Sequence, residues 1–408
     1  MPTPILIAAG VGVFLVLQNS DPEASGEFQA DTLVPWTQTQ LAIAEPFQNQ
    51  PVIDVTTYGA WPNDAVDDTA AIQLALNSMS GGGTLVFPPG EYRYSTAIGS
   101  THDNVKLWGY GGAHLHNTRP DDAYGRHIVL RGAASGIYGF WISTDRHTRG
   151  GSGADYLVVL AGTGQEAVDN WLDWGGIHVS GASSYLVARN WVFNSTADSI
   201  RHTNGASYGR IVGNYVRGSG DDMVSVVSTR GEPMNHNITI EANDLADQYW
   251  GRGIAVVGGE SVVIRNNRIL GASCCAGILV AQENVYNTNG VRDVIVESNV
   301  IAHVQTTGQP KNGVRTGHSA ILLNGDIPQA VRNVIIRWNT IQDTWSDGIR
   351  VQNNSCAIEL IGNSMTSIGQ AGINLSPAIS AACYVYCEGN TRESQPTHNG
   401  RCGPRQAQ

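Results

Sequence analysis

Apolar and polar positions along most of the chain follow one repeated phrase. A β-branched run leads to an asparagine and then to another apolar residue, as in RIVGNYV, TIEANDL, VIRNNRI, IVESNVI, IIRWNTI and ELIGNSM. The asparagines are Asn190, Asn214, Asn243, Asn267, Asn299, Asn339, Asn363 and, less regularly, Asn390. Their spacings are 24, 29, 24, 32, 40, 24 and 27 residues, which indicates a unit of 24 lengthened by inserted loops. Such self-similarity is typical of a solenoid.

A second apolar phrase follows each of the first seven asparagines of the series. The phrases are DSIRH (198–202), DMVSV (222–226), RGIAV (252–256), AGILV (276–280), SAILL (319–323), DGIRV (347–351) and AGINL (371–375). Two strands per turn, with no helical pattern between them, predict an all-β fold: a single-stranded right-handed parallel β-helix. Equivalent residues then stack about 4.8 Å apart, and the asparagines form an internal ladder in which each amide bonds the next.

The segment 52–95 predicts a short N-terminal capping helix before the first coil. Its expected apolar face is Ala71, Ile72, Ala75, Leu76 and Met79, with Asp67 or Asp68 as the N-cap and three glycines, 81–83, as the stop signal. A helix across the open end of a β-helix protects the unpaired strand edge. We therefore place the parallel β-helix domain at residues 51–390 and a C-terminal tail at residues 391–408.

Residues 1–50 carry a different pattern. A thirteen-residue apolar run, Ile5 to Leu17, is shorter than a membrane span of about 20 residues and fits the core of a signal peptide. We expect residues 1–20 to be a signal peptide or an N-terminal anchor, which would make a membrane anchor possible, and residues 21–50 to be a linker. The protein is then exported: secreted, periplasmic or at the cell surface.

The cysteines support export but leave two alternatives open. The six are Cys274, Cys275, Cys356, Cys383, Cys387 and Cys402, and four of them lie in the last 53 residues. They form either disulfides that staple the C-terminal end or buried free thiols. The absence of any CxxC pair argues against a zinc site.

The composition limits the classes of molecule that the protein is expected to bind. The chain has 48 glycines, 14% charged residues and a net charge of −11. The glycines suit many tight turns between short strands, and the acidic balance argues against nucleic acid as a partner, because its binding needs a basic stripe. We expect a monomer.

Three aspartates are the strongest candidates for chemistry. Asp198 and Asp222 are 24 residues apart and occupy the same place in their phrases, so they should stack on neighbouring coils. Asp221 adds a third acid, and Arg252 holds the equivalent position one coil further on. Crowded carboxylates repel, which raises the pKa of one enough for it to act as a general acid. The alternative is that these acids only line solvated turns.

These residues carry a family resemblance. The segment 52–95 resembles the N-terminal cap of the pectate-lyase superfamily of β-helix proteins. The stretch 192–259, with VFNSTADSIRHTNG, SGDDMVSVVS and WGRGIAVVGG, resembles the catalytic coils of bacterial α-1,3-glucanases and mycodextranases, and more distantly those of polygalacturonases. The resemblance implies an inverting glycosidase with Asp198, Asp221 and Asp222 as its catalytic triad. We assign Asp221 as the acid and the other two as the water-activating pair.

Around the triad we expect substrate-binding residues on the same coils. They are Arg201, His202, Trp250, Arg252, Gln282 and Glu283. Structural roles are the competing interpretation for His202, Trp250 and Glu283, and Trp171, Trp174 and Trp191 are assigned to the core. Polygalacturonases have a histidine where Arg252 stands and an arginine-isoleucine-lysine phrase where GILVAQE (277–283) stands, so the resemblance does not extend to that activity.

The sequence thus predicts a glycoside hydrolase that degrades a polysaccharide, with no metal and no cofactor. Two alternatives remain: a Ca²⁺-dependent polysaccharide lyase or uronate C5-epimerase, in which the same acids ligate Ca²⁺ and an arginine removes a proton, and a non-catalytic glycan-binding surface protein.

Overall fold

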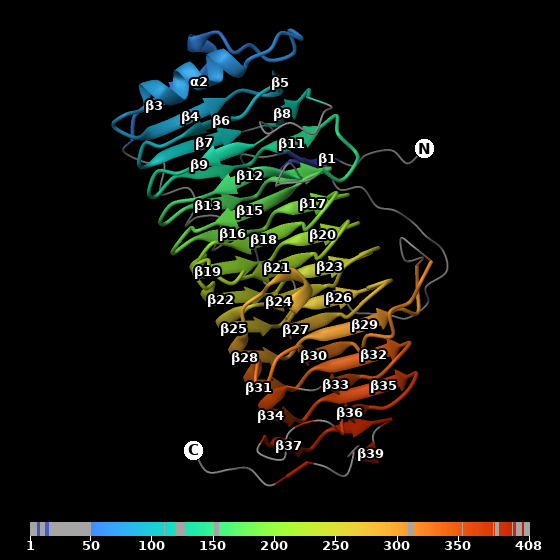
Figure 1. The fold of residues 1–408 in the computed structure, drawn as a ribbon. Helices are drawn as coiled ribbons and strands as arrows, with labels where there is room; N and C mark the ends of the chain where they lie inside the picture. The colour runs from blue at the N-terminus through green and yellow to red at the C-terminus, as the bar shows by residue number, and fades with distance from the viewer. Residues whose placement is uncertain are drawn as a thin grey trace.

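The computed structural model contains one long right-handed parallel β-helix whose coils stack along a single axis (Figure 1). It describes residues 6–8, 13–15, 50–109, 111–119, 127–150, 155–308, 313–352, 354–377, 379, 383–393, 395–396 and 402–403. Three sheets run the length of the solenoid, and each coil contributes one strand to each sheet in turn. The predicted fold class is confirmed.

Sheet 1 is the sheet whose strands precede the asparagines. Its strands, in spatial order, are β3 (Val52–Asp54), β4 (Gly83–Phe87), β7 (Val105–Gly109), β10 (Gly136–Tyr138), β13 (Glu166–Val168), β16 (Leu186–Ala188), β19 (Ser207–Val212), β22 (His236–Glu241), β25 (Gly259–Arg265), β28 (Val291–Glu297), β31 (Val331–Arg337), β34 (Ser355–Ile361) and β37 (Val385–Glu388).

Sheet 2 is the sheet whose strands follow the asparagines. Its strands are β5 (Gly90–Tyr94), β8 (Ala113–Asn117), β11 (Trp141–Thr144), β14 (Trp171–Asp173), β17 (Trp191–Phe193), β20 (Tyr215–Arg217), β23 (Asp244–Ala246), β26 (Arg268–Leu270), β29 (Val300–Val304), β32 (Thr340–Thr344), β35 (Ser364–Ile368), β38 (Thr391–Arg392) and β39 (Gln395–Pro396). All pairs are parallel except β38 with β39.

Sheet 3 is built from the second apolar phrase. Its strands are β6 (Ile98–Ser100), β9 (Ile128–Leu130), β12 (Tyr156–Leu160), β15 (Gly176–Ser180), β18 (Ile200–Thr203), β21 (Val224–Val227), β24 (Ile254–Val257), β27 (Ile278–Gln282), β30 (Ile321–Gly325), β33 (Ile349–Val351) and β36 (Ile373–Leu375). The remaining elements are β1 (Leu6–Ala8) paired antiparallel with β2 (Val13–Leu15), the 3₁₀ helices η2 (Val55–Tyr58) and η3 (Asn284–Tyr286), and α2 (Thr69–Ser78).

The expectation of two strands per turn was wrong, because each coil has three. The asparagine phrase holds two strands: in RIVGNYV, β19 ends at Val212 and β20 begins at Tyr215, with only Gly213 and Asn214 between them. A corner of two residues leaves no polar stretch in the sequence, so the two strands read as one apolar run.

The asparagine ladder occupies this corner between sheets 1 and 2. Each asparagine Nδ2 donates to the Oδ1 of the asparagine one coil on, at 2.8–3.0 Å, from Asn190 through to Asn390. All eight are buried. The predicted ladder is confirmed, and it begins one coil earlier than expected, at Asn170, whose Nδ2 donates to Asn190 at 3.0 Å.

The core runs through the middle of the solenoid and ends under α2, which lies across the N-terminal end of the coils (Figure 1). Ile72, Ala75 and Leu76 of α2 are buried there, as the helical pattern predicted. The expectation that Asp67 or Asp68 is the N-cap is confirmed. Asp68 occupies the N-cap position, but its carboxylate accepts from the backbone N–H groups of Trp61 and Arg93, whereas Asp67 accepts from the N–H of Thr69 at 2.8 Å.

The cysteines are all in disulfides. Cys356–Cys383 and Cys387–Cys402 staple the C-terminal coils, as one of the two alternatives predicted, and Cys274 is bonded to its neighbour Cys275. Among the described residues no helix is long and apolar enough to cross a membrane. Most of the expected signal or anchor (1–20) and of the linker (21–50) lies outside the described residues.

Replacement Asn267→Ala tests the ladder. The Asn267 Oδ1 accepts from the N–H and the Nδ2 of Asn243, and its Nδ2 donates to Asn299 and to the Ile240 carbonyl. Truncation strands these buried partners, so we expect a loss of about 1–3 kcal/mol in stability and a lower thermal midpoint. Gln342→Ala, an exposed amide on β32, is the control. Equal midpoints for the two variants would contradict the ladder's role.

Candidate active site

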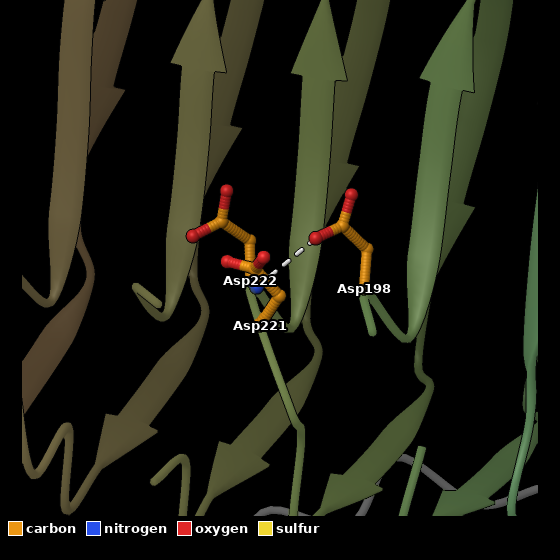
Figure 2. A group of neighbouring side chains, drawn as sticks. All are labelled: Asp198, Asp221 and Asp222. Carbon is orange, nitrogen blue, oxygen red and sulfur yellow. Dashed lines mark hydrogen bonds between the residues drawn. The ribbon is translucent and has the colours of Figure 1, made fainter. Parts of the chain in front are cut away.

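Three carboxylates meet in the turn that leads from sheet 2 to sheet 3. Asp198 and Asp222 each lie two residues before a sheet 3 strand, and those strands pair Ile200 with Val224, so the two acids stack on adjacent coils. Asp221 precedes Asp222 directly. One carboxylate oxygen from each of the three lies within 4.8 Å of the others (Figure 2). The column expected from the 24-residue spacing is present.

Each stacked carboxylate binds the backbone of the following coil. Asp198 Oδ1 accepts from the Asp222 N–H at 3.2 Å (the dashed line in Figure 2), and its Oδ2 accepts from the Ser225 hydroxyl at 2.9 Å. Asp222 Oδ1 accepts from the Arg252 N–H at 2.7 Å. These bonds hold both side chains in one orientation, so the acids are fixed before any substrate arrives.

Two glycines make this packing possible. A Cβ on Gly220 would lie 2.6 Å from the Thr196 carbonyl oxygen and from the Tyr249 hydroxyl. A Cβ on Gly251 would lie 2.5 Å from the Asp221 carbonyl carbon and 2.6 Å from its Oδ1. Any larger residue at either position would displace the backbone that carries the acids.

Burial raises the pKa of two of the acids. Asp198 and Asp222 expose only 6% and 5% of their surface. Burial is the main cause of the raised pKa of Asp198, and repulsion from Asp221 adds to it. Burial also holds the pKa of Asp222 well above its usual range; attraction to Arg252 offsets part of this, and repulsion from Asp221 and Asp198 adds to it.

Asp221 differs from its two neighbours. Its carboxylate forms an ion pair with Arg149, with Nη2 2.6 Å from Oδ2, and it is the most exposed of the three acids. Arg149 belongs to the segment after β11, three coils nearer the N-terminus than Asp221. His147 of that segment stacks on Trp174 with ring centroids 4.1 Å apart.

Arg149 was not among the site residues predicted from the sequence. Its only trace in the sequence is the basic cluster RHTR (146–149) in a long interval between strands, and no spacing rule connects that interval to Asp221.

Arg201, Arg252 and Glu283 are brought together with the triad, as expected. Arg201 Nε is 3.8 Å from Asp198, and Arg252 Nη1 is 3.6 Å from Asp222. Arg252 Nη2 also pairs with Glu283 at 2.6 Å. Together with Arg149, three guanidinium groups face four carboxyl groups.

Two of the expected substrate-binding residues, His202 and Gln282, are buried inside the solenoid. His202 is fully buried; its Nδ1–H donates to the Ser225 carbonyl at 2.8 Å, and burial lowers its pKa to about 4, so it is a neutral core residue. Alternation along β18 turns it inward, beside Ile200 and away from Arg201. Gln282 is fully buried too; its Nε2 donates to Asn284, and its Oε1 accepts from the Asp326 N–H. Both residues therefore have structural roles, while Trp250 is half-buried in the turn before Arg252.

The assignment of two tryptophans to the core was also wrong. Trp171 and Trp191 are 36% and 42% exposed. They belong to a column of aromatic rings on the outer face of sheet 2 that includes Trp141 and Tyr215. Strand alternation places them outside because the intervening residues, such as Leu172 and Val192, fill the core.

The spacing of the triad oxygens would also suit a cation, but the surrounding charges do not. Hard cations such as Ca²⁺ need several oxygen ligands free to coordinate. Here each acid already faces a guanidinium, at distances of 2.6 to 3.8 Å. These residues therefore fit a triad flanked by three arginines better than they fit a resident Ca²⁺.

Replacement Asp222→Asn tests the burial of this acid through stability. Near pH 3.8, the ordinary pKa of an aspartate, the unfolded chain begins to ionise while folded Asp222 keeps its proton. The wild type therefore loses stability as pH rises from there through the raised pKa, and the variant does not. We expect the thermal midpoint of Asp222→Asn relative to wild type to rise between about pH 4 and about pH 7.

Asp244→Asn is the control for this measurement. Asp244 is half-buried on β23 and forms ion pairs with Arg217 and Arg268. A fall in the relative midpoint of Asp222→Asn over the same pH range would show that ionised Asp222 stabilises the fold.

Comparisons with known proteins agree with this architecture. Residues 52–279 match the family model for rhamnogalacturonase A/epimerase, pectate lyase-like. No curated protein matches the chain. Among solved structures, the A-module of the mannuronan C-5 epimerase AlgE6 of Azotobacter vinelandii is similar at 17% identity, with a TM-score of 0.59, 83% of this chain and 98% of that chain covered.

Glycoside hydrolases are similar to a comparable degree. The catalytic domain of a GH87 α-1,3-glucanase in complex with nigerose is 19% identical, with a TM-score of 0.64, 83% of this chain and 69% of that chain covered. The catalytic unit of the thermostable GH87 α-1,3-glucanase of Streptomyces thermodiastaticus is 18% identical, with a TM-score of 0.58 and coverages of 84% and 69%. These likenesses show the fold, and the family match covers more than half of the sequence; the chain belongs to the rhamnogalacturonase A/epimerase, pectate lyase-like family.

Proposed function

We propose that the protein hydrolyses glycosidic bonds of a neutral polysaccharide through Asp198, Asp221 and Asp222. The observation that carries the proposal is the difference in surroundings within one cluster: two buried acids with raised pKa values beside a third that is paired with Arg149. Glycosidases need one carboxylic acid that keeps a proton for the leaving group and one carboxylate that serves as base or nucleophile.

The division of roles differs from the one expected from sequence. Asp222 is our candidate for the acid in place of Asp221, because it is buried and its pKa is raised well above the usual range. Asp221, the most exposed of the three and paired with Arg149, is the candidate for the carboxylate that orients water. Asp198 links the two coils through its bond to the Asp222 N–H and would position both groups.

A neutral substrate follows from the pairing of charges. Recognition of a uronate calls for an arginine that is free to bind a carboxylate. Arg149, Arg201 and Arg252 each already face a carboxylate of the protein, and Arg252 faces two. The similar GH87 enzymes are named α-1,3-glucanases, and one was solved with nigerose, so α-1,3-linked glucans are the first substrates to test.

The stereochemical course is a separate question. Inverting enzymes typically hold their two carboxyl groups about 6.5–9.5 Å apart and retaining enzymes about 5–5.5 Å. The triad oxygens lie within 4.8 Å of one another, so the expected inversion rests on the family resemblance and not on the spacing. Proton NMR of the first-formed anomer distinguishes the two courses.

The test of function is a turnover screen over neutral and uronate glycans with wild type, Asp222→Asn and Asp221→Asn. We expect reducing ends to appear with a neutral glucan, and kcat to fall by about 10²–10⁴-fold for Asp222→Asn with the fold intact. The control Asp244→Asn should keep wild-type kcat. Activity of Asp222→Asn above about a tenth of wild type would exclude Asp222 as the acid.

The same screen tests the second candidate, a Ca²⁺-dependent lyase or C5-epimerase. This candidate is favoured by the similarity to the A-module of the mannuronan C-5 epimerase, of which 98% is covered. Loss of activity with EDTA, its recovery with Ca²⁺, and either an unsaturated product or an epimerised uronate would support this candidate. Binding without turnover across the panel would support a glycan-binding protein.

Arg252 is predicted to act as a positioning residue that tunes Asp222. Its positive charge lowers the pKa of Asp222 against the effect of burial. In Arg252→Gln this attraction is lost, so the pKa of Asp222 rises, and the alkaline limb of the pH–kcat profile should move to higher pH. Arg252→Lys keeps the charge and should keep the profile, raising KM through loss of the planar fork. A collapse of kcat by more than about 10³ in Arg252→Lys, with KM unchanged, would instead make Arg252 the base of a lyase.

A further inference from the structure

The arrangement around Asp198 is repeated near the C-terminal end of the solenoid. The phrases DSIRH (198–202) and DGIRV (347–351) place an aspartate two residues before a sheet 3 strand and an arginine three residues after the aspartate. In both, the arginine Nε points to the aspartate Oδ2, at 3.8 Å for Arg201 and 2.6 Å for Arg350. Asp347 is fully buried, as Asp198 and Asp222 nearly are.

The bonds to the following coil are repeated as well. Asp198 Oδ1 accepts from the N–H of the residue 24 positions on, Asp222, and Asp347 Oδ1 accepts from the N–H of Ala371, also 24 positions on. Asp198 Oδ2 accepts from the side chain of Ser225, 27 positions on, and Asp347 Oδ2 from the side chain of Asn374, again 27 positions on. The two sites share one local geometry.

They differ in the residues that would do chemistry. The positions of Asp221 and Asp222 are taken by Gln370 and Ala371, so the second site has one acid, and that acid is neutralised by Arg350. A lone, paired carboxylate cannot supply both an acid and a base. The second site is therefore built for binding and not for cleavage.

A cavity of about 390 Å³ opens beside it on the outer face of sheet 3. It is lined by Asn324, Arg350, Gln352, Asn374, Ser376 and Pro377. Within the described part of the chain, the side-chain amides of Asn324 and Gln352 have no hydrogen-bond partner. Volume and lining suit a ligand rich in hydroxyl groups and without charge, because amides offer both donors and acceptors and Arg350 is already paired.

This cavity is separate from the triad. The nearest strands of the two sites are β21, which follows Asp222, and β30, which carries Asn324; they are three positions apart in sheet 3, which is about 14 Å at ~4.8 Å per strand. Between them the outer face of the sheet is covered: Ala255, Leu279 and Leu322 form a buried apolar cluster of their own, outside the main core. A sugar in the cavity would therefore not occupy a subsite that adjoins the triad.

We propose that this cavity is a second, non-catalytic site that binds one or two residues of a neutral glycan, built from a copy of the active-site motif. The identity of the glycan rests on the proposed function; the presence of the site does not. A polysaccharide long enough to reach both sites would be held at two points, which increases its apparent affinity through effective concentration.

The test is calorimetric titration of the inactive Asp222→Asn protein with nigero-oligosaccharides of increasing length, and with mannuronan oligosaccharides in a second arm. We expect two binding events for a neutral oligosaccharide. The double variant Asn324→Ala/Gln352→Ala in the same background should lose one event, or weaken it about tenfold or more, and keep the other. Gln342→Ala, an exposed amide on sheet 2, should change neither event.

Kinetics separate this proposal from the proposed function. With intact Asp222, the double variant should keep wild-type kcat and KM on short soluble substrates and show a raised KM on long chains only. A single binding event in the parent, or two events unchanged in the double variant, overturns the second site. Failure of the wild type to cleave any neutral glycan overturns the proposed function instead, and leaves the calorimetric result to decide the second site alone.

Discussion

Parallel stacking of successive coils is the constraint on which the rest of this molecule depends. Each strand bonds to the strand one coil before and one coil after it, so the nearest neighbour of any side chain is the side chain one repeat away. A polar residue that points inward can be tolerated only if its neighbours in the column satisfy it. The asparagines do this along a whole corner of the solenoid, because an amide both donates and accepts.

Aspartates in a column cannot satisfy each other in the same way, because ionised carboxylates only accept hydrogen bonds and repel one another. The fold accommodates Asp198 and Asp222 by giving each a backbone N–H from the next coil and an arginine nearby. Burial without full neutralisation leaves two acids with raised pKa values. The same stacking that makes the solenoid regular thus creates the conditions for acid–base chemistry.

Asp347 has the same local geometry as Asp198 but lacks the neighbouring carboxylates that acid–base chemistry requires. Its bonds reproduce those of Asp198, but Ala371 stands where Asp222 would, and no second carboxylate is forced into the column. The motif at Asp347 then lies beside a cavity lined largely by side-chain amides. A repeat architecture can place several copies of one motif on different coils, and the residues of the adjacent coil decide the role of each copy.

The spacing of the asparagines and of the apolar phrases was enough to predict the β-helix, its ladder and the column that joins Asp198 and Asp222 to Arg252. These features are periodic, and a strand repeat fixes contacts between residues that are one coil apart. Three strands per coil could not be distinguished from two, because a corner as short as Gly213–Asn214 interrupts no apolar pattern.

Features that depend on the path of inserted segments were decided only by the tertiary structure. Arg149 reaches Asp221 from a loop three coils away, so no repeat spacing connects them. His202 and Gln282 belong to the phrases that form sheet 3, but both side chains are buried, because inward and outward positions alternate along each strand. The Gln282 side chain also bonds the turns around η3, where its Oε1 accepts from the Asp326 N–H. The sequence by itself determined which residues stack. The path of the loops and the alternation of inward and outward positions along each strand decided which of them are exposed and which partners hold each acid.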